Sequence, residues 1–394
     1  MTLRWITGKG VTAAKGFQAS GVSAEIKASG ARDLALIFSG RPASAAGTFT
    51  TNLAAAAPVQ VSRERVAAGV ARGVVVNSGC ANAATGKRGY DDAVEMAALA
   101  AAAVGIPAEE MLVCSTGLIG SNLPMERVTA GIRQAAAGLS DEDASATEAI
   151  MTTDTRPKRA AVASDEGWSV GGIAKGAGMI APRMATMLAF ITTDAEVEPR
   201  SLRPTLSEVV DWTFNAITID GDTSTNDTVI CLANGASGVA PGFDEFPEAL
   251  NTVCRSLAEQ IVADGEGATK FVRVRVTGAR TTDEARASAR TVAESLLVKT
   301  ALWGGDPNWG RVVAALGRSG TDFDPEKISI SIGGFDLLVR GEPVTEEARV
   351  AARSAIKSYD EMAIVCDLAS GGEWFEIMTT DLSPKYVELN AAYE

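Results

Sequence analysis

Residues 175–191 read Lys-Gly-Ala-Gly-Met-Ile-Ala-Pro-Arg-Met-Ala-Thr-Met-Leu-Ala-Phe-Ile. A glycine-rich approach and a turn at Pro182 precede an apolar strand expected over Met187–Ile191. Glycine permits backbone geometries that other residues resist, so strain can be concentrated at one neighbouring peptide bond. The Ala185–Thr186 bond is the candidate, because a threonine that becomes a chain N-terminus holds a nucleophilic hydroxyl and a basic amine in one residue.

The chain of 394 residues contains no histidine. Histidine is the usual side-chain base near neutral pH and the commonest metal ligand, so its absence excludes Ser-His-Asp catalysis, Cys-His catalysis and His-ligated zinc. The expected self-cleavage begins when Thr186 Oγ1 attacks the Ala185 carbonyl; water then hydrolyses the resulting ester and leaves a free Thr186 amine. On these residues alone, a glycine-rich turn that leads into a core strand is the alternative interpretation.

Composition and charge exclude several classes of partner. Hydrophobic residues make up 46% of the chain and aromatic residues only 5%, which predicts alanine-rich, aliphatic cores in two or three domains. The net charge of -13 argues against binding to nucleic acid or to an anionic membrane surface. The longest apolar stretch, Met96–Val104, is too short to span a bilayer and the start lacks a secretion signal, so we expect a cytoplasmic protein.

The cysteines show no metal-binding or redox spacing. They are Cys80, Cys114, Cys231, Cys254 and Cys366. A dispersed, odd set of this kind predicts reduced thiols that serve mostly as small core residues, and no metal site is expected.

Short apolar runs alternate with helical patterns, which predicts a mixed α and β architecture. Strands are expected at Leu34–Phe38 and Gly73–Asn77. A helix is expected to begin at the capping residue Asp91 and to end at Gly105. A later helix places Leu250, Val253, Leu257 and Ile261 on one face and leads into a glycine-rich exit.

The pattern changes beyond the alternating strand expected at Phe271–Val276. Three elements are expected after it: a helix opened by the capping box Thr281–Glu284, a hairpin about Gly333-Gly334, and a helix over Thr345–Lys357. The sequence therefore predicts a nucleophile domain at residues 1–275 and a smaller α/β domain at residues 276–394.

Seven ordered segments resemble those of the ornithine acetyltransferase family, the glutamate N-acetyltransferases of arginine biosynthesis. They are Val74–Asn82, Cys114–Gly120, Ile150–Asp154, Lys175–Leu188, Asp220–Thr228, Asp264–Lys270 and Gly305–Arg311. The resemblance extends over nearly the whole chain. It implies an α/β (α+β) fold, with a layered sheet-helix sandwich of the self-cleaving aminopeptidase type and a separate C-terminal α/β domain.

The resemblance also implies a reaction. A chain cut before Thr186 would leave two pieces folded together, and dimers of such pairs (α2β2) are expected. Thr186 Oγ1 would take the acetyl group from N-acetylornithine, release ornithine and pass the group to glutamate. No cofactor or metal is implied, and the sequence leaves open whether acetyl-CoA is a second donor.

The family's site residues carry over to matching positions. Thr116 and Gly117 match an oxyanion hole, where the alternative is an ordinary turn at a strand end. Lys175 matches a lysine that binds the substrate α-carboxylate, where the alternative is a solvated surface lysine. Three further positions match substrate contacts: Thr152, Glu266, which suits the ornithine ammonium, and Asn390.

Two other features qualify the match. The run Asp220–Asp227 suits a hard-cation site, but side chains that bond the turn backbone are the favoured interpretation. The family usually carries Ser or Thr two residues beyond its final tyrosine, whereas this sequence stops at Tyr393-Glu394. We expect that substrate contact to be missing or replaced.

Three rival functions stay open. A related self-cleaving aminopeptidase or amidase would pass the acyl group to water instead of an amine. A secondary-metabolism acetyltransferase would use the same chemistry on another substrate. A non-catalytic metabolite-binding protein would keep its chain intact at Thr186.

Overall fold

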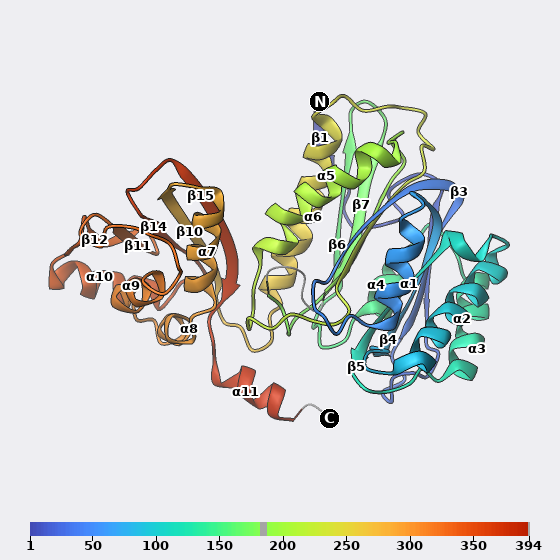
Figure 1. Ribbon diagram of the computed structural model, residues 1–394, viewed down its shortest axis with the longest axis horizontal. Helices are drawn as coiled ribbons and strands as arrows, with labels where there is room; N and C mark the ends of the chain where they lie inside the picture. The colour runs from blue at the N-terminus through green and yellow to red at the C-terminus, as the bar shows by residue number, and fades with distance from the viewer. Residues whose placement is uncertain (182–186, 393–394) are drawn as a thin grey trace. The chain divides into compact units, whose positions relative to one another are not determined.

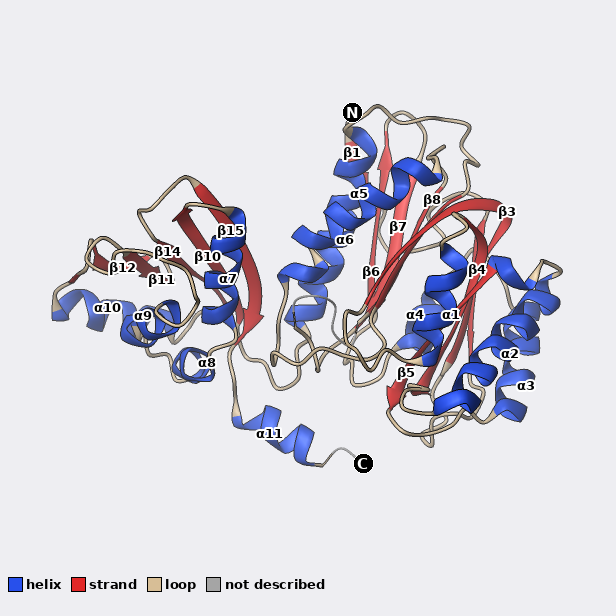
Figure 2. Cartoon of the chain, in the orientation of Figure 1, coloured by secondary structure: helices blue, strands red, loops and turns tan. Residues whose placement is uncertain are grey.

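Short runs rich in Val, Ile and Ala pair into a mixed sheet of nine strands in the computed structural model, which describes residues 1–181 and 187–392 (Figures 1 and 2). The strand order is β1-β6-β7-β8-β9-β3-β4-β5, and β2 pairs with β3. The pairs β4/β5 and β8/β9 are parallel and the others antiparallel. The strands are β1 Leu3–Trp5, β2 Phe17–Val22, β3 Leu34–Phe49, β4 Val70–Cys80, β5 Met111–Leu118, β6 Lys158–Ser164, β7 Ser169–Lys175, β8 Leu188–Thr193 and β9 Thr228–Ala233.

Helices cover both faces of this sheet. Leu34 and Leu36 of β3 belong to a core cluster with residues of α1, α2 and α3, whereas Ala35 and Ile37 belong to a second cluster with residues of α4. This alternation follows from the period of two along a strand, and it produces a layered α/β unit. The helices are α1 Ala57–Val66, α2 Gly86–Val104, α3 Met125–Ala137, α4 Ala144–Ile150, α5 Pro199–Trp212 and α6 Glu245–Ala263, with 3₁₀ turns at Ala108–Glu110 and Phe214–Ala216.

A second sheet of six strands, in the order β13-β12-β11-β14-β10-β15, organises the C-terminal part of the chain. Its strands are β10 Phe271–Ala279, β11 Ser329–Ile332, β12 Phe335–Val339, β13 Glu342–Pro343, β14 Glu361–Asp367 and β15 Glu373–Thr380. Its helices are α7 Thr282–Ala293, α8 Leu296–Trp303, α9 Trp309–Leu316, α10 Glu346–Ile356 and α11 Pro384–Ala391. The mixed α/β fold expected from the sequence is confirmed.

Contacts divide the chain into two units. The first contains Met1–Asn215 and Asp222–Ile261, and the second contains Ala216–Gly221 and the chain from Val262 onward. The domain boundary expected at residues 275 and 276 falls inside β10, since that strand pairs with β14 and β15 of the second sheet. No helix in the described ranges is long and apolar enough to cross a membrane.

Several local predictions are confirmed. Val272, Val274 and Val276 are fully buried on β10. Gly333 and Gly334 have φ of 61° and 85° at the β11/β12 hairpin, the backbone region that a tight turn with glycine favours. The Thr281 hydroxyl accepts the Glu284 N–H at 3.1 Å as the N-cap of α7, and Thr345 caps α10. The five cysteines are buried and form no disulfide.

Two predicted boundaries are wrong. Helix α2 begins at Gly86, so Asp91 is not its cap but lies one turn inside, where it pairs with Lys87 at 2.6 Å. Strand β3 continues to Phe49 instead of ending at Phe38, because a register shift between Phe38 and Ala43 absorbs Gly40 and Pro42. The first half of β3 pairs with β2 and the second half with β9.

Candidate active site

Lys175 is the last residue of β7, opposite Leu188 at the start of β8. The segment that joins these two strands contains the predicted cleavage bond, and both Ala185 and Thr186 lie outside the described residues. The described chain resumes at Met187, which is buried and donates its N–H to Asp227 Oδ1 at 2.9 Å. The residue that follows Thr186 is therefore held by a buried carboxyl group.

The Lys175 side chain is almost fully buried, which rules out the solvated surface lysine considered from the sequence. Its ammonium donates to Thr152 Oγ1 at 2.7 Å and lies 4.0 Å from Asp154 Oδ2. The structure thus brings together two residues, Lys175 and Thr152, that the sequence assigned to the substrate. They lie 23 positions apart in the chain.

Asp154 supports this pair of residues. Its carboxylate accepts the Gly176 N–H at 2.7 Å, the Thr152 N–H at 3.0 Å and the Lys158 ammonium at 2.6 Å. Burial disfavours the charged carboxylate, but the Lys175 and Lys158 ammonium groups outweigh it and lower the pKa of Asp154 to about 2. Asp154 is therefore ionised at neutral pH and fixes the Lys175 segment.

Thr116 and Gly117 lie near the end of β5. Thr116 is 1% exposed, and its hydroxyl is among the buried polar atoms that have no hydrogen-bond partner in the described part of the chain. Gly117 has φ of 130°, and a Cβ there would come 2.4 Å from the Gly79 carbonyl carbon. Only glycine fits this position, so the β5 end approaches β4 more closely than an ordinary strand end would.

The run Asp220–Asp227 is tied to the β5 end. Asn226 Nδ2 donates to the carbonyls of Ala81 at 2.7 Å and Ser115 at 2.9 Å, and its own N–H bonds to Ser224 Oγ at 3.0 Å. These bonds confirm the interpretation that the run's side chains bond backbone groups. Within residues 1–181 and 187–392, no group of three or more Cys, Asp or Glu residues could hold a metal ion.

Asp227 is fully buried, and sequence reasoning missed it as a site residue. Burial raises the pKa of Asp227 well above its ordinary value, against the opposing effects of the Met187 amide and the Lys175 charge. Its Oδ2 atom has no hydrogen-bond partner among the residues that the structure describes. The Asp220–Thr228 motif was the only available signal, and it gave no reason to prefer this aspartate to its neighbours.

The second unit holds the other two predicted substrate contacts. Asn390 on α11 donates from Nδ2 to Glu266 Oε2 at 2.9 Å. Gly267, beside Glu266, has φ of 67°, and a Cβ there would lie 2.4 Å from the Tyr386 amide nitrogen. The glycine therefore permits the close approach of the Glu266 loop to α11. The final residues, Tyr393 and Glu394, lie outside the described part of the chain.

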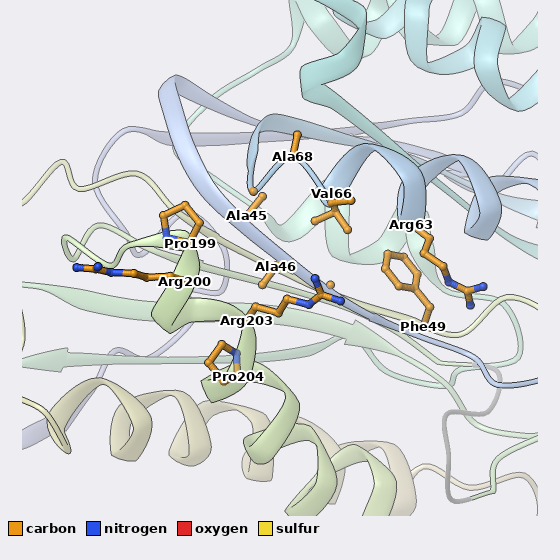
Figure 3. A pocket seen from close by; sticks show the side chains of 13 residues that line it. Ala45, Ala46, Phe49, Arg63, Val66, Ala68, Pro199, Arg200, Arg203 and Pro204 are labelled. Carbon is orange, nitrogen blue, oxygen red and sulfur yellow. The ribbon is translucent and has the colours of Figure 1, made fainter.

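A groove of about 480 Å³ elsewhere in the first unit contains none of these residues (Figure 3). Its arginines are Arg63 from α1 and Arg200 and Arg203 from α5. The Arg63 guanidinium lies 5.5 Å from the Phe49 ring centre and bonds the Thr50 carbonyl, while Arg200 pairs with Glu198. The groove is therefore separate from the Lys175 cluster.

Comparisons with known proteins show which family the chain belongs to. The model of the ArgJ family matches residues 18–394. The arginine biosynthesis bifunctional protein ArgJ of Symbiobacterium thermophilum is 50% identical, over 99% of this chain and 100% of that protein. The ArgJ of Mycolicibacterium paratuberculosis is 47% identical, over 99% of this chain and 98% of that protein.

Two solved structures are also similar. The ornithine acetyltransferase of Mycobacterium tuberculosis, complexed with ornithine, shares 46% identity with a TM-score of 0.45 over 46% of this chain and 98% of that chain. The ArgJ of Bacillus halodurans shares 41% identity with a TM-score of 0.50 over 52% of this chain and 98% of that chain. The fold, the motifs and the full-length similarity to the ArgJ proteins define an enzyme of arginine biosynthesis. The chain belongs to the ArgJ family.

Proposed function

We propose that Thr186 carries the acetyl group in the reaction of this ArgJ-family enzyme. The chain is an ornithine acetyltransferase and glutamate N-acetyltransferase of arginine biosynthesis, on identity of about half its residues over its full length. The observation that best supports the proposed substrate site is the hydrogen bond from the buried Lys175 ammonium to Thr152, because both residues also match the family's substrate contacts.

In the first half-reaction, Thr186 Oγ1 attacks the acetyl carbon of N-acetylornithine while the Thr186 amine takes the hydroxyl proton. The carbonyl oxygen gains negative charge, which the Thr116 hydroxyl and the Gly117 N–H stabilise. The carbon–nitrogen bond of the substrate then breaks, and the proton passes to the leaving α-amine of ornithine. In the second half-reaction, the α-amine of glutamate attacks the acetyl ester and restores Thr186.

The buried cluster gives the substrate a charged anchor. Lys175 binds the α-carboxylate that both amino acids share, and Thr152 and Asp154 hold the lysine in place. The absence of a hydrogen-bond partner for Thr116, among the described residues, supports its assignment, because a buried hydroxyl without a partner is costly unless a ligand supplies one. The resemblance assigns Glu266 and Asn390 to the substrate as well, and within the second unit the Asn390 amide donates to the Glu266 carboxylate.

We infer self-cleavage between Ala185 and Thr186. The solved ArgJ of Bacillus halodurans supports it, because that chain is matched over 98% of its own length and yet corresponds to only 52% of this one. Pieces of residues 1–185 and 186–394 would each make up about half of the chain. The cytoplasmic location, the α2β2 assembly and acetyl-CoA as a second donor stay predictions.

The test is an acetyl-transfer assay with N-acetylornithine or acetyl-CoA as donor and glutamate or water as acceptor. We expect ornithine to be released catalytically from N-acetylornithine only when glutamate is present. Equal ornithine release without glutamate would favour the aminopeptidase or amidase alternative. Mass spectrometry of the denatured protein must show a fragment that begins with Thr186; an intact, fully active chain would refute the terminal amine as base.

A further inference from the structure

The proposed function leaves one question of charge recognition open. N-acetylornithine and glutamate share the α-amine position and the α-carboxylate, but beyond Cβ one carries an ammonium and the other a second carboxylate. A buried or partly buried carboxylate is bound favourably by a cation. If Lys175 binds the α-carboxylate, glutamate needs another cation for its γ-carboxylate.

Lys27 is a cation beside the Lys175 cluster that the sequence motifs do not include. Its ammonium donates to the Met151 carbonyl at 2.7 Å and to the Arg32 carbonyl at 2.8 Å. Lys175 bonds the side chain of Thr152, the next residue along the chain. The two ammonium groups are thus attached to consecutive residues of one short segment, and Lys27 is only partly buried, so its charge is accessible to a ligand.

The stem of Lys27 lies beside the oxyanion segment. A Cβ at Gly79 would come 3.0 Å from Lys27 Cγ, so the absence of a side chain at position 79 makes room for the lysine. Gly79 is paired in register with Gly117 across β4 and β5. The Lys27 stem therefore lies near Gly79, which pairs with the proposed oxyanion residue Gly117, and its ammonium lies at Met151, next to the Thr152 that bonds Lys175.

The charges around Lys27 favour an anion. Lys158 and Lys175 both pair with Asp154, and the Lys27 ammonium interacts electrostatically with Asp33 and Asp154. Asp33 is occupied by the backbone N–H groups of residues 24, 26 and 27, and Asp154 by the contacts already described. Lys158 is fully buried and bonds Asp154, which leaves Lys27 as the better placed second cation.

Electrostatics agree with this placement. Burial lowers the pKa of Lys27, Asp33 opposes that effect, and the neighbouring Lys175 charge lowers it further. The interaction with Lys175 means that the two ammonium groups lie close enough to repel each other. A γ-carboxylate bound to Lys27 beside an α-carboxylate bound to Lys175 would offset that repulsion.

We propose that Lys27 binds the γ-carboxylate of glutamate and so determines acceptor specificity in the second half-reaction. This inference depends on the proposed function. It predicts that loss of the Lys27 charge affects the acceptor step alone, because ornithine has no second carboxylate. The role is one of specificity, since Lys27 transfers neither the acetyl group nor a proton in the proposed reaction.

The experiment measures the two half-reactions separately in the self-cleaved protein. N-acetylornithine alone should form an acetyl-enzyme with release of ornithine, which mass spectrometry and a rapid-quench assay record. The isolated acetyl-enzyme is then mixed with glutamate or with glutamine, which has the same shape and no γ charge. The variants are Lys27→Met and Lys27→Gln, with Lys27→Arg to restore the charge and Lys87→Met as a control on the exposed surface of α2.

For Lys27→Met and Lys27→Gln, kcat/KM for glutamate should fall roughly 10- to 100-fold, the loss expected for one charge-assisted contact. The glutamine reaction and the acetylation step should change less than about threefold, and Lys27→Arg should recover most of the glutamate rate. Lys87→Met should behave like the wild type. Wild-type acetyl-enzyme should itself prefer glutamate to glutamine by at least about tenfold, which tests the proposal even if the neutral variants fail to fold.

An equal loss in both half-reactions, an equal loss with glutamine, or unchanged glutamate kinetics would each overturn the role of Lys27. A wild type without preference for glutamate would do the same. If the wild type forms no acetyl-enzyme with N-acetylornithine, the proposed function fails and the role of Lys27 fails with it. An acetyl-enzyme that forms normally while Lys27→Met keeps full glutamate activity refutes the lysine alone.

Discussion

Replacing Asp154 with asparagine should destabilise the first unit and remove part of its acid sensitivity. The side chain of Asp154 is fully buried, and its carboxylate compensates the equally buried Lys158 ammonium at 2.6 Å. Asparagine has nearly the same shape and keeps one acceptor for the Gly176 N–H. The substitution therefore removes the negative charge while the packing stays almost unchanged.

The magnitude follows from the pKa of Asp154, which is about 2 in the folded protein against 3.8 for the unperturbed group. A difference of this size corresponds to about 2 kcal/mol of stability at neutral pH. Loss of one partner from a buried ion pair costs about 3–5 kcal/mol, because the other charge is left uncompensated. We expect Asp154→Asn to lower the free energy of unfolding by about 2–4 kcal/mol at pH 7.

The pH dependence gives the sharper test. Because the folded pKa is lowered, the stabilisation by Asp154 is present above pH 4 and is lost as the pH falls toward 2. The wild type should lose thermal stability across that window, and the difference between wild type and Asp154→Asn should shrink there. The control is Asp165→Asn in the same unit, since the Thr2 N–H also lowers the pKa of Asp165 but its side chain is exposed.

Scanning calorimetry at one fixed scan rate from pH 7 to pH 2.5 measures both effects. The two units need not unfold together, so the transition of the first unit is followed. A variant whose midpoint equals that of the wild type at pH 7 would refute the reasoning. A gap between the two proteins that stays constant from pH 5 to pH 2.5 would show that the lost charge is not the cause.

Three further predictions concern the reaction. Thr186→Ala should leave one intact chain on a denaturing gel and abolish acetyl transfer. Lys175→Met should raise KM for N-acetylornithine roughly 10- to 100-fold, with fragment content measured in the same sample; unchanged kinetics would remove its role in carboxylate binding. Thr116→Ala should slow turnover roughly 100-fold at nearly unchanged KM, because the hydroxyl stabilises charge that develops only in the transition state. A raised KM at an unchanged turnover rate would instead show that Thr116 binds the substrate in its ground state.

The sequence predicted elements whose signals are local. The alternating valines of β10, the capping box at Thr281–Glu284, and the glycine pair at the β11/β12 hairpin each specify a structure within a few residues. The predicted end of β3 was wrong because the same local residues are compatible with two structures, a strand end and an irregularity within a strand. Gly40 and Pro42 resemble the end of a strand, but the pairing partners on both sides carry β3 past them.

The candidate site also contains residues that could be predicted from the sequence and residues that could not. Lys175, Thr152 and Thr116 lie in motifs and could be named from the sequence, but Lys27 and Asp227 could not. Lys27 reaches the site through a bond to Met151, 124 positions away, and Asp227 through a bond to Met187, 40 positions away. Such contacts depend on the fold of the sheet, and a single sequence has no periodicity that encodes them.

These long-range bonds indicate how the enzyme would hold the proposed nucleophile, Thr186, once self-cleavage has made it a chain terminus. A free N-terminus has no preceding peptide bond to fix it, so its position must be set from the residue that follows. Met187 supplies that point, because its N–H is bound to the buried Asp227, and β8 begins directly after it. Asn226, the neighbour of Asp227, bonds the Ser115 carbonyl next to Thr116. One short segment therefore fixes both the chain after Thr186 and the proposed oxyanion donor, Thr116. A displacement of this segment should impair the proposed self-cleavage and acetyl transfer together.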